Sequence, residues 1–123
     1  MLQGAGKPGH MGRTTAVEAC IDACLTCVEE CEYCADACLN DDQVAHMAEC
    51  IRICRDCADF CGLCASLLAR NSDLQVEQCR VCAIACDLCA EECEQHPQPH
   101  CLRCAEACRR CAEQCRQVAQ EDV

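Results

Sequence analysis

The sequence predicts an all-α fold: an antiparallel, up-down-up-down four-helix bundle with a cysteine-lined core. Three observations predict it. Cysteine accounts for 21 of the 123 residues, and the cysteines fall into four groups. Within each group, steps of three and four residues alternate, which places all its cysteines on one stripe of an α-helix. The connections between groups are short, so consecutive helices run antiparallel.

The cysteine stripes define the helices, because a strand would need a period of two. The residues between the cysteines are mostly good helix formers such as Ala, Glu, Gln, Arg and Leu. We expect a single bundle domain over residues 14–123, with helices at about 15–39, 43–70, 73–95 and 99–119. The four stripes are Cys20, Cys24, Cys27, Cys31, Cys34 and Cys38; Cys50, Cys54, Cys57, Cys61 and Cys64; Cys79, Cys82, Cys86, Cys89 and Cys93; and Cys101, Cys104, Cys108, Cys111 and Cys115.

Signals for helix ends in the first half of the chain agree with these spans. Residues 1–13 are rich in Gly and polar residues and are predicted to form a tail. Thr15 with Glu18 has the spacing of a capping box and is predicted to open the first helix. The polar residues 40–42 separate the first helix from the second. Asn71 suits the left-handed position that often follows a helix.

The second half of the chain has similar signals. Ser72 with Gln75 again has capping-box spacing, which predicts the start of the third helix. Pro97 cannot continue that helix, and Pro99 suits the first turn of the fourth.

Composition excludes several classes of function. The formal net charge of −11 disfavours binding to nucleic acid or to an anionic membrane surface. No apolar run is long enough to span a membrane, and the N-terminus lacks an apolar or twin-arginine export signal, so a cytoplasmic location is expected. The odd cysteine count argues against a disulfide scaffold. No catalytic triad or pair of carboxylates stands out, so no enzyme activity is expected.

Thiols on these stripes predict a site for soft metal ions. Side chains three or four residues apart on a helix lie close enough for one ion to bridge them. Thiolates favour Cu(I), Zn(II) and iron–sulfur clusters. A Cys₄ zinc site leaves about two negative charges in the core, whereas exchange of H⁺ for Cu⁺ keeps the core neutral. The spacing also differs from ferredoxin motifs. We therefore expect storage of multiple Cu(I) ions by all 21 cysteines.

Two other functions remain open from the residues alone. One is a zinc or general soft-metal buffer with a role like that of metallothionein. The other is a thiol redox protein that uses C-x-x-C pairs such as Cys24 with Cys27 and Cys31 with Cys34. Redox motifs normally lie at the start of a helix, where the thiol pKa is lowered, and these pairs lie in mid-helix.

The antiparallel course gives the bundle two different ends. Three of the four histidines and one methionine meet at the end where the first helix leads to the second and the third leads to the fourth; this His/Met end consists of His46, Met47, His96 and His100. We expect copper to enter there, since imidazole and thioether bind Cu(I) more weakly than thiolate. The opposite end is expected to be plugged by apolar side chains, namely Leu67, Leu68, Leu74, Val76 and Val118.

A second apolar stripe runs beside the cysteines on three helices. Two interpretations remain open: these side chains seal the corners between helices, or they form a face for self-association. The stripe comprises Ile21, Leu25, Val28, Ile53, Phe60, Leu63, Leu67, Val81 and Leu88.

With C-x₃-C-x₂-C ladders on every helix, the chain resembles the bacterial copper storage proteins over about residues 14–119. The lack of an export signal matches the cytosolic branch of that family. The resemblance implies Cu(I) clusters along the bundle axis, cysteine ligands at the ladder positions and a homotetramer of bundles. Copper ions are the expected partners, supplied by a copper chaperone or a low-molecular-weight thiol.

Overall fold

The computed structural model describes residues 12–121, and this part of the chain is almost entirely helical. It contains four α-helices and one short 3₁₀-helix, namely α1 (Thr15–Leu39), η2 (Val44–Met47), α2 (Ala48–Ala69), α3 (Gln75–Cys93) and α4 (Pro99–Glu121). The predicted all-α fold is confirmed. None of the described helices is both long and apolar enough to cross a lipid bilayer.

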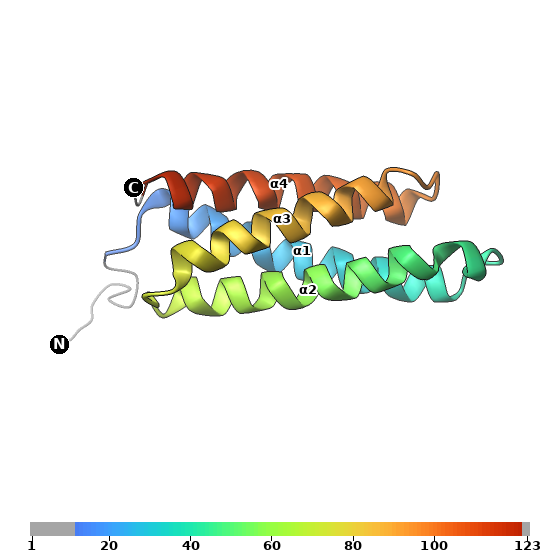
Figure 1. The fold of residues 1–123 in the computed structure, drawn as a ribbon, viewed down its shortest axis with the longest axis horizontal. Coiled ribbons are helices and arrows are strands. Elements are labelled where there is room, and N and C mark those ends of the chain that lie inside the picture. The colour runs from blue at the N-terminus through green and yellow to red at the C-terminus, as the bar shows by residue number, and fades with distance from the viewer. Residues whose placement is uncertain (1–11, 122–123) are drawn as a thin grey trace.

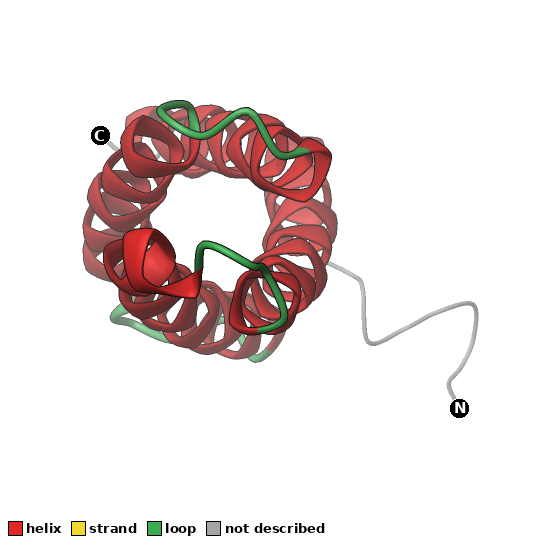
Figure 2. Cartoon of the chain, turned by 90° about the vertical axis from the view of Figure 1, so that its right-hand side faces the viewer, coloured by secondary structure: helices red, strands yellow, loops and turns green. Residues whose placement is uncertain are grey.

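The four long helices lie side by side and alternate in direction (Figure 1). Helix α1 packs against α2 and α4, and α3 packs against the same two helices. Seen along its axis, the bundle is a ring of four helices (Figure 2). The α1–α2 and α3–α4 connections lie at one end, as the antiparallel course predicts, and the α2–α3 connection lies at the other.

Helix boundaries differ from the expected ones mainly in the second helix. The first turn of the segment expected as one helix over residues 43–70 is instead the 3₁₀-helix η2, and α2 itself begins at Ala48. Helix α3 is two residues shorter at each end than the expected 73–95. The α1–α2 connection therefore occupies more of the chain than the cysteine spacing indicates.

Both predicted capping boxes are wrong. The N-cap of α1 is Thr14, whose Oγ1 accepts a hydrogen bond of 3.1 Å from the backbone N–H of Val17. Thr14 and Thr15 both carry a hydroxyl that could cap the helix, and the helix begins so that Thr14 is the N-cap. Ser72 caps a turn rather than a helix: its Oγ accepts from the N–H of Leu74, the residue just before α3.

The end of α2 follows the prediction for Asn71. Its φ of 55° is the left-handed conformation that Asn tolerates better than most residues. The N–H of Asn71 donates to the carbonyl of Leu68 and that of Ser72 donates to the carbonyl of Leu67, at 3.2 and 2.9 Å. This pair of bonds is the Schellman motif, which satisfies carbonyls that the helix end leaves free.

The core is filled by cysteine and alanine. All 21 cysteines are completely buried, and alanines such as Ala90 and Ala112 occupy neighbouring buried positions. Because these side chains are small, the helices can pack closely without large aliphatic residues between them. Cysteine side chains therefore make up most of the core. Four of the five residues predicted to plug the α2–α3 end are buried, namely Leu67, Leu68, Val76 and Val118. Leu74 is 63% exposed because it precedes α3 on the connection.

The predicted N-terminal tail lies mostly outside the described residues, which begin at Gly12. Arg13, at its boundary, lies against the bundle. Its guanidinium donates to Glu18 on α1 at 3.0 Å and to the backbone carbonyl of Ala69, at the end of α2, at 2.9 Å. These two bonds tie the start of α1 to the end of α2.

Candidate metal centre

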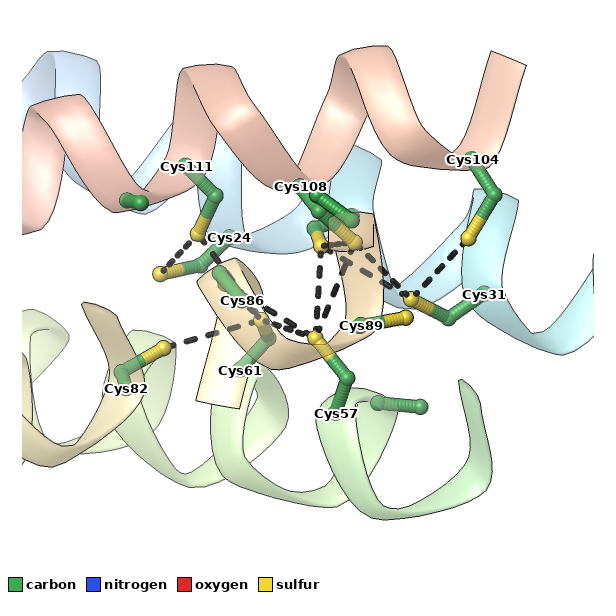
Figure 3. Close-up of a cluster of buried hydrophobic side chains, with 14 of the residues drawn as sticks. Cys24, Cys31, Cys57, Cys61, Cys82, Cys86, Cys89, Cys104, Cys108 and Cys111 are labelled. Carbon is green, nitrogen blue, oxygen red and sulfur yellow. Dashed lines mark hydrogen bonds between the residues drawn. The ribbon is translucent and has the colours of Figure 1, made fainter. Parts of the chain in front are cut away.

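The 21 thiols form one column along the bundle axis, which we call the thiol column. Each helix turns its cysteine stripe inward, because the alternating three- and four-residue steps keep the stripe on one face. Every cysteine is a free thiol, and each has zero exposed surface. Figure 3 shows the middle of the column, where sulfurs from all four helices point toward one another.

Sulfur atoms in this column are in contact. Neighbouring Sγ atoms lie 3.6–4.0 Å apart, within helices and between them. Cys57 has four close sulfur neighbours: its Sγ is 3.9 Å from those of Cys27, Cys61 and Cys108 and 3.7 Å from that of Cys86. An ion placed between such sulfurs would gain two or more thiolate ligands without movement of the backbone.

Contacts of this kind make most of the column continuous. From Cys38, close sulfur contacts lead through Cys50, Cys93 and Cys54 toward the middle of the bundle. They continue through Cys104, Cys31 and Cys27 to Cys57, and from there to Cys61, Cys111 and Cys24. An ion could therefore move along the column by exchange between sulfurs that already touch.

The last layer before the apolar plug has its close sulfur contacts within itself, although Cys64 and Cys115 lie within 4.8 Å of Cys24 and Cys82 in the next layer. Its four thiols form two close pairs, Cys20 with Cys115 at 3.6 Å and Cys64 with Cys79 at 3.7 Å. All four sulfurs lie within 4.8 Å of one another, with one thiol from each helix. Other sets of four at this spacing recur along the column, for example Cys27, Cys57, Cys61 and Cys86.

Protonation differs within the thiol layer nearest the His/Met end. Burial, followed by the charge of Cys50, raises the pKa of the Cys38 thiol to about 11. The same two causes raise the pKa of Cys101. Hydrogen bonds from Cys34, Cys54 and Cys93 lower the pKa of Cys50. Within this layer, the pKa of Cys50 is thus lowered while the pKa values of Cys38 and Cys101 are raised.

At the His/Met end, one histidine reaches the thiol column. His100, in the first turn of α4, has its Nε2 atom 3.5 Å from the Sγ of Cys38. It is partly buried, so the imidazole lies between solvent and the first thiols. Among the four residues predicted for this end, it is the one with a described contact to a cysteine.

The other three residues of the His/Met end are placed differently. Met47 is buried, with 1% of its surface exposed, at the end of η2. His96 pairs with Glu92 through an Nε2–Oε2 contact of 2.9 Å, and both side chains are partly buried. His46 is exposed. The topology brought the four residues to one end, but their side chains do not converge on a single point.

The sequence did not indicate the part played by Gln98 and Asp41 at this end. Gln98 lies between two prolines in the α3–α4 connection, and its side-chain amide donates to the Oδ2 of Asp41 at 3.3 Å. It also donates to the Sδ of Met47 at 3.9 Å. Neither residue type suggested copper chemistry, and contact between the two connections follows only from the tertiary fold.

Part of the second apolar stripe seals the corners between helices, and part of it remains exposed. Ile21, Val28 and Ile53 pack against the core and help to seal the corners between helices. Large apolar side chains on α2 and α3 remain exposed, among them Ile84 at 59% and Leu88 at 50%. With Ile53, Phe60 and Val81, these two line a shallow groove of about 170 Å³ between α2 and α3.

Comparison with known proteins gives this arrangement a family. The sequence model of the copper storage proteins matches residues 13–120, almost the whole chain. The chain belongs to the copper storage protein family. The match covers all four cysteine-bearing helices, so the resemblance that the ladder indicated is confirmed.

Solved members of the copper storage family have the same fold. The chain is 42% identical to the Cu(I)-bound copper storage protein BsCsp3, with a TM-score of 0.82 over 85% of this chain and 99% of that one. It is 39% identical to a cytosolic copper storage protein from Streptomyces lividans described with five coppers, with a TM-score of 0.83 over 85% and 92% of the two chains. The curated cysteine-rich protein YhjQ of Bacillus subtilis, described as uncharacterized, is 43% identical over 73% of this chain and 83% of its own.

Proposed function

We propose that this protein stores many Cu(I) ions as thiolate clusters in the core of its bundle. One observation carries the proposal: 21 free thiols, all buried, form a column in which neighbouring sulfurs lie 3.6–4.0 Å apart. Thiolates are soft ligands that favour Cu(I) and Zn(II), and the spacing suits thiolates that bridge adjacent ions. The Cu(I)-bound relative of the same fold supports this assignment.

Charge favours copper as the cargo. The column has no basic side chain, since the buried residues in the described part of the chain are all apolar, alanine or cysteine. Multiple dianionic Cys₄ zinc sites would therefore place uncompensated charge in a dry core. Each Cu⁺ that replaces a thiol proton leaves the net charge unchanged, however many ions are bound.

Zinc is the second candidate, because the geometry of individual layers would accept it. Tetrahedral coordination at a Zn–S distance of about 2.3 Å places sulfurs roughly 3.8 Å apart. The close contacts between thiols have similar lengths, and sets of four such as Cys20, Cys64, Cys79 and Cys115 lie within 4.8 Å of one another. The core could hold one such zinc site, whereas a full column of them would bury many uncompensated negative charges.

A thiol redox function is less well supported. The C-x-x-C pair of Cys24 and Cys27 has no exposed surface, and the same is true of Cys31 and Cys34. A substrate disulfide would have to reach sulfurs inside the bundle to be attacked. We therefore propose a binding protein and not an enzyme.

Anaerobic metal titration separates these functions. Reduced, metal-free protein is titrated with Cu(I), and separately with Zn(II), in competition with chelators of known affinity. Storage predicts tight binding of about one Cu(I) per thiol and far fewer zinc ions per chain. Saturation at one or two coppers, or zinc binding that equals copper binding, would contradict the proposal.

We assign all 21 cysteines as ligands and the His/Met end as the place where copper enters and leaves. His100 beside Cys38 supports this choice, and Met47 supplies a buried thioether at the same end. The apolar plug of Leu68 and Val118 makes the opposite end less favourable for an ion. In this assignment His46 and His96 are auxiliary ligands that capture ions at the surface.

Partners follow from the same proposal. Cu(I) is not free in a cell, so a copper chaperone or a low-molecular-weight thiol delivers it, in the cytosol as for the Streptomyces relative. We further propose a homotetramer, as the family resemblance implies. The exposed apolar groove between α2 and α3 is the face through which two copies would pack, because exposed apolar side chains such as Ile84 and Leu88 line it.

A further inference from the structure

Gln98 has a fixed backbone at the His/Met end. It lies between Pro97 and Pro99, whose rings restrict the chain on either side. Its carbonyl accepts hydrogen bonds from the N–H groups of Cys101 and Leu102, at 3.0 and 3.1 Å. These bonds hold the backbone of Gln98 at the start of α4.

The Gln98 side chain crosses from one connection of the bundle to the other. The amide Nε2 donates to Asp41, in the α1–α2 connection, at 3.3 Å, and to the sulfur of Met47 at 3.9 Å. Asp41 is held in turn, because its Oδ1 accepts from the N–H of Gln43 at 2.7 Å. Both connections face the viewer in Figure 2, at the end where His100 meets the thiol column.

The link that Gln98 makes is easily opened. Both amide protons are used, but the Oε1 atom is buried and has no hydrogen-bond partner among the described residues. A buried acceptor without a donor destabilises the closed position, which offsets part of what the two donated bonds contribute. Thioether sulfur is also a weak acceptor. When the amide swings out, its oxygen gains water and the Met47 sulfur loses its only described polar partner.

We propose that Gln98 is a latch that controls how fast copper passes the His/Met end. This inference rests on the proposed storage function and on uptake at that end. In the closed position the amide occupies the Met47 sulfur and ties the two connections together. In the open position the thioether is free to take Cu(I) and hand it on toward Cys38 and His100. The latch sets rates in both directions and leaves the number of stored ions unchanged.

Replacement of Gln98 by Ala tests the latch, with Gln95→Ala as the matched control. Gln95 is an exposed glutamine three residues earlier whose amide bonds only to the Glu91 carbonyl of its own segment. Uptake is followed by stopped flow from a Cu(I)–chelator complex, release is followed into excess chelator, and capacity is measured by titration. Gln98→Ala is expected to accelerate uptake and release alike by roughly three- to tenfold, the size of one hydrogen bond, with capacity unaltered. Gln95→Ala is expected to match the wild type.

A second variant separates a latch from general loosening of the bundle. Met47→Leu preserves apolar volume but removes the sulfur, so Gln98→Ala/Met47→Leu is expected to lose the acceleration. A merely looser structure would keep it. The latch would be overturned if Gln98→Ala had wild-type rates. It would also be overturned if the double variant, which lacks the Met47 sulfur, still showed the acceleration. A low copper capacity of the wild-type protein in the same titration would instead overturn the storage function.

Discussion

The Nε2 atom of His100 lies 3.5 Å from the Sγ of Cys38, so an imidazole at the bundle end touches the first thiol of the column. From Cys38, close sulfur contacts lead to Cys50 and Cys101, each at 3.9 Å. The contact therefore joins a solvent-facing ligand to an interior that is otherwise sealed by its own helices.

Replacement of His100 by Ala is expected to slow Cu(I) uptake and release more than the same change at His46. His100 contacts the column, whereas His46 is exposed and its side chain faces solvent. Stopped-flow transfer to and from a Cu(I) chelator measures both rates, and titration measures capacity, which is expected to stay near that of the wild type. Equal effects of the two variants would show that proximity to Cys38 is irrelevant.

Much of this structure could be read from the sequence, for a physical reason. Cysteines at three- and four-residue steps fix both the helical period and the buried face, so the fold and the thiol column follow from one pattern. Features that change when a helix begins one residue earlier or later could not be predicted from this pattern. The choice of Thr14 over Thr15 as N-cap and the exposure of Leu74 are examples.

At the His/Met end, too, some features could be predicted from the sequence and others could not. Topology alone placed His96 and His100 at one end, because antiparallel helices return there. Which histidine turns inward depends on competing partners: Glu92, one turn before His96, holds that ring by a contact of 2.9 Å between Nε2 and Oε2. The Gln98 amide link could not be predicted, since it joins two connections 57 residues apart in sequence.

Replacement of Cys57 by Ala is expected to lower the Cu(I) capacity more than replacement of Cys79. Cys57 has four close sulfur neighbours, so its thiolate would bridge several ions, whereas Cys79 has one close contact, with Cys64. Titration of both variants under anaerobic conditions measures the difference. Both remove one buried sulfur, which makes Cys79→Ala the matched control for packing. Equal losses of capacity would contradict a column of shared thiolates.

Replacement of Asn71 by Ala is expected to destabilise the reduced, metal-free bundle by roughly 1 kcal/mol, because a β-carbon crowds the left-handed conformation. The φ of 55° and the Schellman bonds of Ser72 and Asn71 require that conformation. Asn71→Gly is expected to be as stable as the wild type or slightly more so, since Gly suits this position. Urea denaturation followed by circular dichroism measures both changes. A neutral Asn71→Ala variant would contradict this account.

Alkaline pH is expected to destabilise the metal-free protein. The pKa of Cys38 is raised from 9.0 to about 11, and that of Cys101 is raised by the same burial and by the charge of Cys50. A raised pKa in the folded state means that the folded chain holds its protons more tightly than the unfolded chain. The stability that this contributes is fully present below pH 9.0 and is lost as pH rises toward about 11.

Thermal unfolding at a series of pH values measures this effect, with the copper-loaded protein as control. Copper replaces the thiol protons, so the loaded bundle is expected to show little dependence on pH over the same window. Because protons and copper compete, acid is expected to weaken copper binding by about tenfold per pH unit for each thiol proton displaced. A metal-free protein equally stable at pH 8 and pH 11 would contradict the raised pKa values.

Replacement of Ile84 by Glu is expected to dissociate the proposed oligomer into monomers. Ile84 is 59% exposed and lines the apolar groove between α2 and α3, so a carboxylate there would be desolvated by a second copy. Sedimentation velocity measures the mass, and Gln117→Glu on the exposed side of α4 controls for the added charge. Each chain encloses its own thiol column, so copper capacity per chain is expected to be the same in monomer and oligomer. An Ile84→Glu variant that keeps the wild-type mass would place the interface on another face of the bundle.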